Sequence, residues 1–182
     1  GLGGDKMRAA GCDIRVDYRD MAYMGFVAVI ANLHKVRRNM RIARQTLLQE
    51  QPNVLILIDY PSFNLCIAKF CHKYLPNTRI IYYIPPKIWA WKEYRIKSIR
   101  RDVDELFSIL PFEVKWFAER GYPIHYVGNP CVDAIAKSAP AHSIPQQQIA
   151  ILAGSRRQEI KDNLQMMLKA ASTFKDYKLV IA

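Results

Sequence analysis

Four segments of this chain lie where chemistry could be carried out, because each directly follows an apolar run that is typical of a buried strand. In open parallel sheets, ligands bind beyond the carboxyl ends of the strands. These positions are therefore where a substrate is expected. The four segments are Asp59, Pro85, Gly128-Asn129-Pro130 and Gly154-Ser155-Arg156.

Asp59 is the strongest candidate for a catalytic group. A carboxylate at the lip of a buried strand can be partly desolvated, which suits it to act as a general base. The same position also suits a turn residue or a helix cap ahead of Pro61. Ser62 and Asn64 have the same two interpretations, with capping favoured. Residue type and position alone leave both interpretations of Asp59 open.

The segment Gly154-Ser155-Arg156 precedes a predicted helix. Free backbone N–H groups at a helix start, together with a guanidinium group, can form a seat for phosphate or pyrophosphate. An ordinary turn from strand to helix explains the same residues. The pattern therefore indicates a candidate anion site without deciding for it.

A basic and aromatic stretch follows Pro85-Pro86 and contains Trp89, Trp91, Lys92 and Arg95. Such a stretch could stack on single-stranded nucleic acid and contact its phosphates. It could also lie on an anionic bilayer with its indoles at the headgroup level. A third interpretation is a helix with one buried aromatic side. The net charge of +11 favours an anionic partner but does not choose among nucleic acid, membrane and phosphorylated substrate.

Several reaction classes lack their motifs in this sequence. No GxGxxG or GxxxxGK[ST] segment follows a predicted strand, and neither GxSxG nor HExxH occurs. The four histidines are scattered, and no His/Cys group has zinc-like spacing. We therefore expect no metal site and no bound cofactor.

The elements that must position these groups alternate between helix and strand. The apolar run Val54–Ile58 indicates a central parallel strand that is buried on both faces. The alternation predicts a doubly wound, Rossmann-like α/β fold. No apolar stretch reaches the roughly 18–20 residues that cross a bilayer. Strands are predicted at 13–16, 54–58, 79–84, 105–110, 124–127, 149–152 and 178–181, and helices at 5–11, 23–50, 63–74, 88–101, 112–120 and 159–174.

The composition changes over residues 137–148, which hold two prolines and three glutamines. Such a segment is typical of an interdomain linker. We therefore predict a first domain over 1–136, a linker over 137–148, and the beginning of a second domain over 149–182.

Five ordered motifs resemble those of the lipid-A-disaccharide synthase family, and together they cover nearly the whole chain. Their order and spacing make the set far more specific than any single motif. They are GGDKM at 3–7, MGFV at 24–27, IDYPSFN at 58–64, the series WAW, ILPFE and VGNPCVD between 89 and 133, and LAGSRRQEI at 152–160.

The resemblance implies a GT-B fold, with two Rossmann-like domains facing across a cleft. The implied reaction transfers a diacylglucosaminyl group from UDP-2,3-diacylglucosamine to 2,3-diacylglucosamine 1-phosphate, with inversion, without a metal or cofactor, and with UDP as the leaving group. Asp59 matches the family's catalytic aspartate, and Arg156 matches an arginine needed for activity. Gly154, Ser155, Asn64 and Asn129 are the further substrate-binding residues that we carry over.

The resemblance also implies a location and partners. The protein is expected in the cytoplasm of a Gram-negative bacterium, peripheral to the inner face of the inner membrane, with no nucleic acid partner. The basic and aromatic stretch would contact the anionic surface of this membrane. The resemblance does not decide whether the protein forms a homo-oligomer. The residues expected at the membrane are Trp89, Trp91, Lys92 and Arg95.

This sequence also departs from the family pattern. Ser62 stands where the family commonly has aspartate, and Asn129 where it commonly has histidine. The family's first strand is expected before Gly1 and most of its nucleotide-binding half after Ala182, so we predict an incomplete chain that is inactive alone. Asp59 is expected to face Arg156 across an interdomain gap.

Two rival functions remain at this stage. One is another GT-B sugar-nucleotide enzyme that acts on a soluble acceptor. The other is a basic nucleic-acid-binding module, although the chain lacks an RRM or KH signature.

Overall fold

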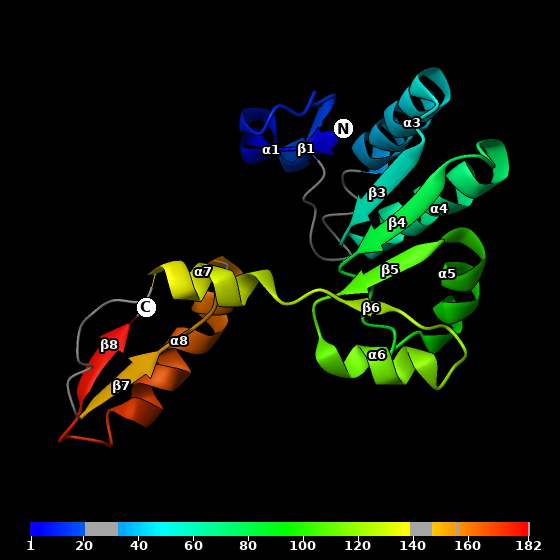
Figure 1. Cartoon of the computed structure of the whole chain (residues 1–182). Helices are drawn as coiled ribbons and strands as arrows, with labels where there is room; N and C mark the ends of the chain where they lie inside the picture. The colour runs from blue at the N-terminus through cyan, green and yellow to red at the C-terminus, as the bar shows by residue number, and fades with distance from the viewer. Residues whose placement is uncertain (21–32, 139–146, 156, 182) are drawn as a thin grey trace. The chain divides into compact units, whose positions relative to one another are not determined.

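The computed structural model describes residues 1–20, 33–138, 147–155 and 157–181 (Figure 1). The chain forms two compact units, Gly1–Ile135 and Ala136–Ala182. Each unit combines helices with parallel strands, which confirms the predicted α/β class. Within the segment predicted as a linker, 139–146 lie outside the described residues. The predicted linker overlaps a helix and a strand at its two ends. The helix α7 (Pro130–Ser138) includes its first two residues, and the strand β7 (Gln148–Ile151) begins at its last residue.

The first unit is built on a four-stranded parallel sheet in the order β3-β4-β5-β6. The register pairs Leu57 with Tyr82, and Tyr82 with Leu106. One helix connects each strand to the next. The strands are β3 (Val54–Ile58), β4 (Arg79–Tyr83), β5 (Glu105–Ser108) and β6 (His125–Tyr126), and the connecting helices are α4 (Pro61–Tyr74), α5 (Ile96–Asp102) and α6 (Pro111–Ala118).

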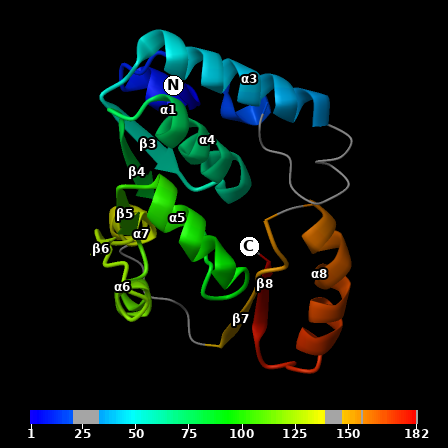
Figure 2. The same cartoon turned by 90° about the vertical axis from the view of Figure 1, so that its right-hand side faces the viewer.

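Three helices lie side by side in front of this sheet in Figure 2: α3 (Leu33–Glu50), α4 and α5. Alternate strand residues point toward them, because side chains of a strand alternate between its faces. Leu57, Tyr82 and Leu106 supply the sheet's side of the core, and Ile67 and Ile99 supply the helices' side. Burial of each such side chain contributes about 1.5–3 kcal/mol.

The prediction that Val54–Ile58 is buried on both faces was wrong. Within the described part of the chain, β3 is the edge strand of its sheet, and only Leu57 is buried. Val54, Ile56 and Ile58 are 46, 60 and 48% exposed. These three side chains face away from α4 and line a cavity that is described below.

A small parallel pair precedes α3 in the first unit. Strands β1 (Leu2–Gly3) and β2 (Val16–Asp17) pair in parallel, and α1 (Asp5–Ala9) and the short 3-10 helix η1 (Tyr18–Asp20) follow them in turn. The predicted helix at 5–11 is confirmed over 5–9, and the predicted strand at 13–16 begins only at Val16. Of the helix predicted at 23–50, residues 23–32 lie outside the described residues, as does the motif at 24–27.

The single helix predicted over 88–101 was wrong at its beginning. Residues 88–90 form a turn, Trp91 lies at a bend, and Lys92 adopts a left-handed φ of 59°. A 3-10 helix, η2, then spans Glu93–Arg95 before α5 starts. Ile88 is only 2% exposed, so the chain before the helix is held by burial rather than by helix periodicity. The helix α7 was not among the predicted elements.

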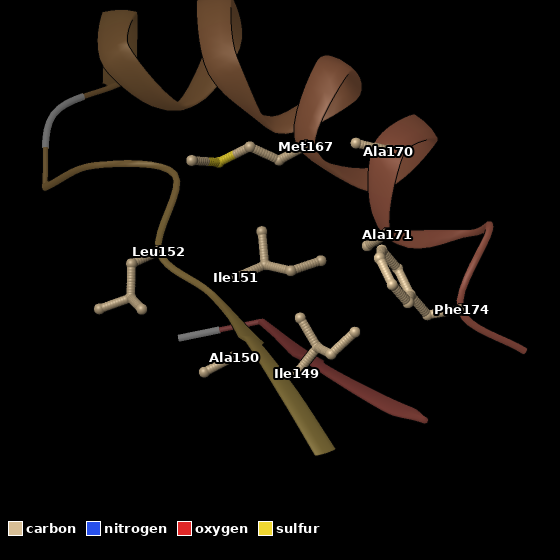
Figure 3. A pocket seen from close by; sticks show the side chains of 8 residues that line it. All are labelled: Ile149, Ala150, Ile151, Leu152, Met167, Ala170, Ala171 and Phe174. Carbon is tan, nitrogen blue, oxygen red and sulfur yellow. The ribbon is translucent and has the colours of Figure 1, made fainter. Parts of the chain in front are cut away.

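The second unit consists of β7, α8 (Arg157–Ala171) and β8 (Lys178–Ile181), with the two strands parallel. These elements match the three predicted here, with the bounds of β7 and α8 shifted and those of β8 unchanged. Between β7 and α8 lies a hollow of about 370 Å³. Figure 3 shows that its eight lining side chains are all apolar, among them Ile151, Met167 and Phe174. These side chains offer packing and no polar chemistry.

Candidate functional site

The candidate site lies at the carboxyl edge of the four-stranded sheet. Because all four strands are parallel, the segments that follow them meet at one edge. Asp59 follows β3, the turn with Trp89 and Trp91 follows β4, and Asn129 follows β6 within a few residues. The sheet therefore gathers most of the predicted first-domain residues along one edge.

Asp59 lies in a tight left-handed turn between β3 and α4. Both Asp59 and Tyr60 have positive φ angles, 46° and 47°. For residues with a Cβ atom this conformation costs about 1–2 kcal/mol each. Pro61 then begins α4 with its fixed φ, and the Asn64 N–H donates to the Tyr60 carbonyl over 3.1 Å. The turn places Asp59, directly after the strand, in an exposed position.

The backbone carbonyl of Asp59 accepts two side-chain hydrogen bonds. Asn64 Nδ2 donates to it over 2.6 Å, and Tyr82 Oη over 2.8 Å. Asn64 Nδ2 also donates to the carbonyl of Ile58 over 3.0 Å. The amide of Asn64 thus stabilises the turn, and its predicted role in substrate binding stays a prediction.

Tyr82 is fully buried beneath this turn. Burial raises the pKa of its hydroxyl well above the usual range, and the nearby charge of Asp59 acts in the same direction. The hydrogen bond to Asn64 and the charge of Arg95 lower this pKa in part. The hydroxyl therefore stays protonated at neutral pH and remains a donor. The sequence analysis missed Tyr82, because a tyrosine in an apolar run reads simply as a strand residue.

The side chain of Asp59 is exposed and lies at the end of a cavity of about 700 Å³. The described residues therefore do not provide the desolvation that the sequence predicted. Most of the cavity wall is apolar and comes from the open side of β3 and from α3 and α4. Its residues include Leu2, Met7, Ala43, Leu47, Val54, Ile56, Ile58, Asp59, Phe63, Asn64 and Ile67.

The turn after β4 is anchored by a buried carboxyl group. Glu113, 1% exposed at the start of α6, accepts the indole N–H of Trp89 over 2.7 Å. The hydroxyl of Ser108 donates to its other oxygen. The ring of Trp89 also packs edge-on against Phe112, with centroids 5.0 Å apart. These contacts fix the position of Trp89 and of the turn from which the exposed residues after it project.

Four aromatic side chains at this edge are exposed, and we call them the aromatic patch: Trp89, Trp91, Tyr94 and Phe112 are 38, 65, 68 and 50% exposed. Lys92 Nζ lies 3.8 Å from the ring centroid of Trp91, within cation–π distance. Arg95 is half-buried. Tyr94 and Phe112 are members that the sequence analysis did not single out, although both lie within or beside the quoted motifs.

Asn129 caps the helix α7. Its Oδ1 accepts the backbone N–H of Cys131 over 3.0 Å, as a side chain at a helix N-cap does. A cap of this kind explains the residue without a ligand.

In the loop that was predicted to bind an anion, a carboxylate of the protein already accepts one of the backbone N–H groups. The backbone N–H of Ser155 donates to a carboxylate oxygen of Glu159 over 3.2 Å. Gly154 has a φ of +127°, and a Cβ there would meet the Cβ of Glu159 at 2.6 Å. The Ser155 N–H is therefore not free, and an anion would have to displace Glu159. Arg156 lies outside the described residues, so its predicted relation to Asp59 stays a prediction.

Among the described residues, no group of three or more His, Cys, Asp and Glu side chains is placed to hold a metal ion. None of the described helices is both long and apolar enough to cross a membrane.

A family model described as LpxB, lipid-A-disaccharide synthetase, matches residues 1–181. The chain belongs to this family. The match includes all five quoted motifs, so the resemblance found in the sequence is confirmed. In this member of the family, parallel strands and their connecting helices position the motifs.

Relatives of the family are similar along almost the whole chain. A lipid-A-disaccharide synthase of Trichlorobacter lovleyi is 38% identical over 179 residues, covering 94% of this chain and 46% of the relative. One from Geobacter sulfurreducens is 33% identical over 184 residues, covering 97% and 47%. The lipid-A-disaccharide synthase 1 of Legionella pneumophila strain Lens is 38% identical over 179 residues, covering 94% and 46%. The chain thus spans about half the length of these relatives.

A solved structure supports the fold of this family member. A Listeria monocytogenes protein assigned as a UDP-N-acetylglucosamine 2-epimerase aligns with a TM-score of 0.59 at 13% identity. The alignment covers 96% of this chain and 50% of that protein. At this identity the likeness concerns the fold, and it agrees with the GT-B type of architecture that the sequence predicted.

Proposed function

We propose that these residues form the acceptor side of a lipid-A-disaccharide synthase, over 1–136, and the beginning of its nucleotide side, over 149–182. The reaction joins the diacylglucosaminyl group of UDP-2,3-diacylglucosamine to 2,3-diacylglucosamine 1-phosphate and releases UDP. The observation that carries the proposal is the family match over 1–181, with the family's aspartate at the carboxyl end of β3. The chain spans about half the length of its relatives, so we propose this activity for the chain extended with the remaining regions of such a relative.

Asp59 acts as the general base in this proposal. Its carboxylate accepts the proton of the acceptor's attacking hydroxyl as the oxygen bonds to the anomeric carbon. The bond from that carbon to the diphosphate breaks at the same time, and its electron pair leaves with UDP. The exposure of Asp59 at the end of a cavity supports access by an acceptor hydroxyl.

The negative charge on the departing diphosphate needs positive partners. Arg156 and the loop Gly154-Ser155 at the start of α8 are the residues we propose for this role. Guanidinium groups and helix starts both favour phosphate oxygens. Binding of the diphosphate would replace the contact between Glu159 and the Ser155 N–H.

The aromatic patch, with Lys92 and Arg95, is proposed to hold the protein against the cytoplasmic face of the inner membrane. Both substrates carry acyl chains, so they reside in a bilayer. Indole side chains prefer the headgroup level, and cations are attracted to anionic lipids. Trp91 and Tyr94 are the most exposed members and would contact the headgroups first.

The test uses an extended chain, in which the regions of the Trichlorobacter lovleyi relative outside the match are joined to these 182 residues. UDP release is measured with UDP-2,3-diacylglucosamine and with UDP-N-acetylglucosamine, each with diacylglucosamine 1-phosphate in mixed micelles. We expect turnover with the acylated donor, as for the relative itself. Turnover with the unacylated donor alone would contradict the proposed acylated donor and favour another GT-B sugar-nucleotide enzyme.

A further inference from the structure

The left-handed turn at Asp59 is held by groups from two different elements. Asn64 belongs to the first turn of α4, and Tyr82 to the neighbouring strand β4. Both donate to the same carbonyl oxygen, over 2.6 and 2.8 Å. A backbone conformation that is unfavourable for residues with a Cβ persists only where its surroundings hold it.

We propose that Tyr82 and Asn64 are positioning residues for Asp59, because their hydrogen bonds to its carbonyl hold the turn that directs its carboxylate toward the acceptor. The inference rests on the proposed function for its kinetic consequence, but its structural part does not. The N–H of Asp59 donates to the Tyr83 carbonyl over 3.0 Å, so the residue is fixed to β4 through its N–H and its carbonyl.

The burial of Tyr82 makes its hydrogen bond a firm one. Its hydroxyl reaches the turn from below, out of solvent, where water does not compete for the carbonyl. Replacing it with phenylalanine removes one oxygen and keeps the ring in the core. The Asp59 carbonyl then loses one of its two donors, and the turn becomes free to relax toward ordinary φ values.

The kinetic test uses the extended chain with Tyr82→Phe and, as a second variant, Asn64→Leu, which removes the amide donor at similar size and adds no charge beside Asp59. We expect kcat to fall about tenfold for each, with KM changed by less than about twofold, since only the placement of the base changes. The control is Tyr74→Phe, at the opposite end of α4, where the hydroxyl is exposed.

A double-mutant cycle separates positioning from simple stabilisation. In an Asp59→Asn background, Tyr82→Phe should cause no further loss of kcat, because the group that it positions is gone. An equal loss in both backgrounds, or an unchanged kcat of Tyr82→Phe alone, would overturn the proposal. An unsubstituted extended chain without turnover, or full turnover by Asp59→Asn, would instead overturn the proposed function.

The structural test needs no activity and uses the 182-residue chain. The coupling between the amide and α protons of Asp59 and its backbone chemical shifts report its φ by NMR. We expect a left-handed Asp59 in the unsubstituted chain and in Tyr74→Phe, and an averaged signature in Tyr82→Phe and Asn64→Leu. A left-handed Asp59 retained in both of these variants would refute the positioning role, whatever the fate of the proposed reaction.

Discussion

The indole N–H of Trp89 donates a hydrogen bond of 2.7 Å to the buried carboxyl group of Glu113, 24 residues further along the chain. This bond ties the turn after β4 to the start of α6. Ser108, at the end of β5, donates to the same carboxyl group. The side chain of Glu113 thus connects three elements at the carboxyl edge of the sheet. The residues of the aromatic patch lie in or beside these elements.

Glu113→Ala should destabilise the first unit by about 2–4 kcal/mol, because it opens a cavity and leaves the donors of Trp89 and Ser108 without their buried acceptor. Glu113→Gln keeps the size and an acceptor oxygen, and should cost roughly 1 kcal/mol. Urea unfolding, followed by circular dichroism, measures both. Equal stabilities of the alanine variant and the unsubstituted chain would show that this network contributes nothing to the fold.

Trp91→Ala and Lys92→Ala should each weaken binding to anionic vesicles. A cation near an anionic surface contributes about 1 kcal/mol, so the loss of Lys92 should lower the partition coefficient about fivefold at moderate salt. Cosedimentation with vesicles that contain about one third phosphatidylglycerol measures this, with neutral vesicles as reference.

The matched control for the membrane prediction is Lys73→Ala. Lys73 also lies beside an aromatic ring, that of Tyr74, but at the end of α4 that precedes β4 rather than at the carboxyl edge of the sheet. Its removal should leave binding close to that of the unsubstituted chain. A loss as large as that from Lys92→Ala would indicate attraction by net charge rather than by the aromatic patch.

Much of the scaffold could be predicted from local sequence. The apolar run VLILI, the proline after it and the alternation of helix and strand were enough to put Asp59 at the end of β3. Burial could not be read in the same way, because Val54, Ile56 and Ile58 are as apolar as Leu57 yet are exposed on a strand that, among the described residues, is at the edge of its sheet. Hydrophobicity predicts a strand but not how many layers cover it.

Long-range hydrogen bonds account for most of what the sequence did not reveal. Tyr82 and Asp59 are 23 residues apart, and Trp89 and Glu113 are 24 apart, so no local pattern connects either pair. The second bond, with the burial of Ile88, explains why the helix predicted from 88 begins only at Ile96. In contrast, α7 has a local sequence signal, since Asn129-Pro130 is a favourable cap followed by proline at the first helical position.

Alkaline pH should destabilise the first unit through Tyr122, which is partly buried against the core. Burial, assisted by the charge of Asp104, raises the pKa of Tyr122 to about 12 from 10.0, and its hydroxyl donates to the Val103 carbonyl over 2.9 Å. The folded state therefore holds this proton more tightly than the unfolded chain. The resulting stability is fully present below pH 10 and is lost as the pH rises toward 12.

Urea unfolding between about pH 8 and 11 measures this dependence. Tyr122→Phe should reduce the loss of stability at high pH, whereas Tyr94→Phe, whose side chain is 68% exposed, should not. Identical pH dependences of the Tyr122→Phe variant and the unsubstituted chain would remove Tyr122 from this explanation.

The central claim is that Asp59 removes the proton from the acceptor hydroxyl. The most direct measurement is the rate of UDP release by the extended chain with Asp59→Asn, at saturating UDP-2,3-diacylglucosamine and diacylglucosamine 1-phosphate. The account predicts a kcat lower by a factor on the order of 10² or more, with unchanged unfolding in urea. A kcat close to that of the unsubstituted extended chain would contradict it.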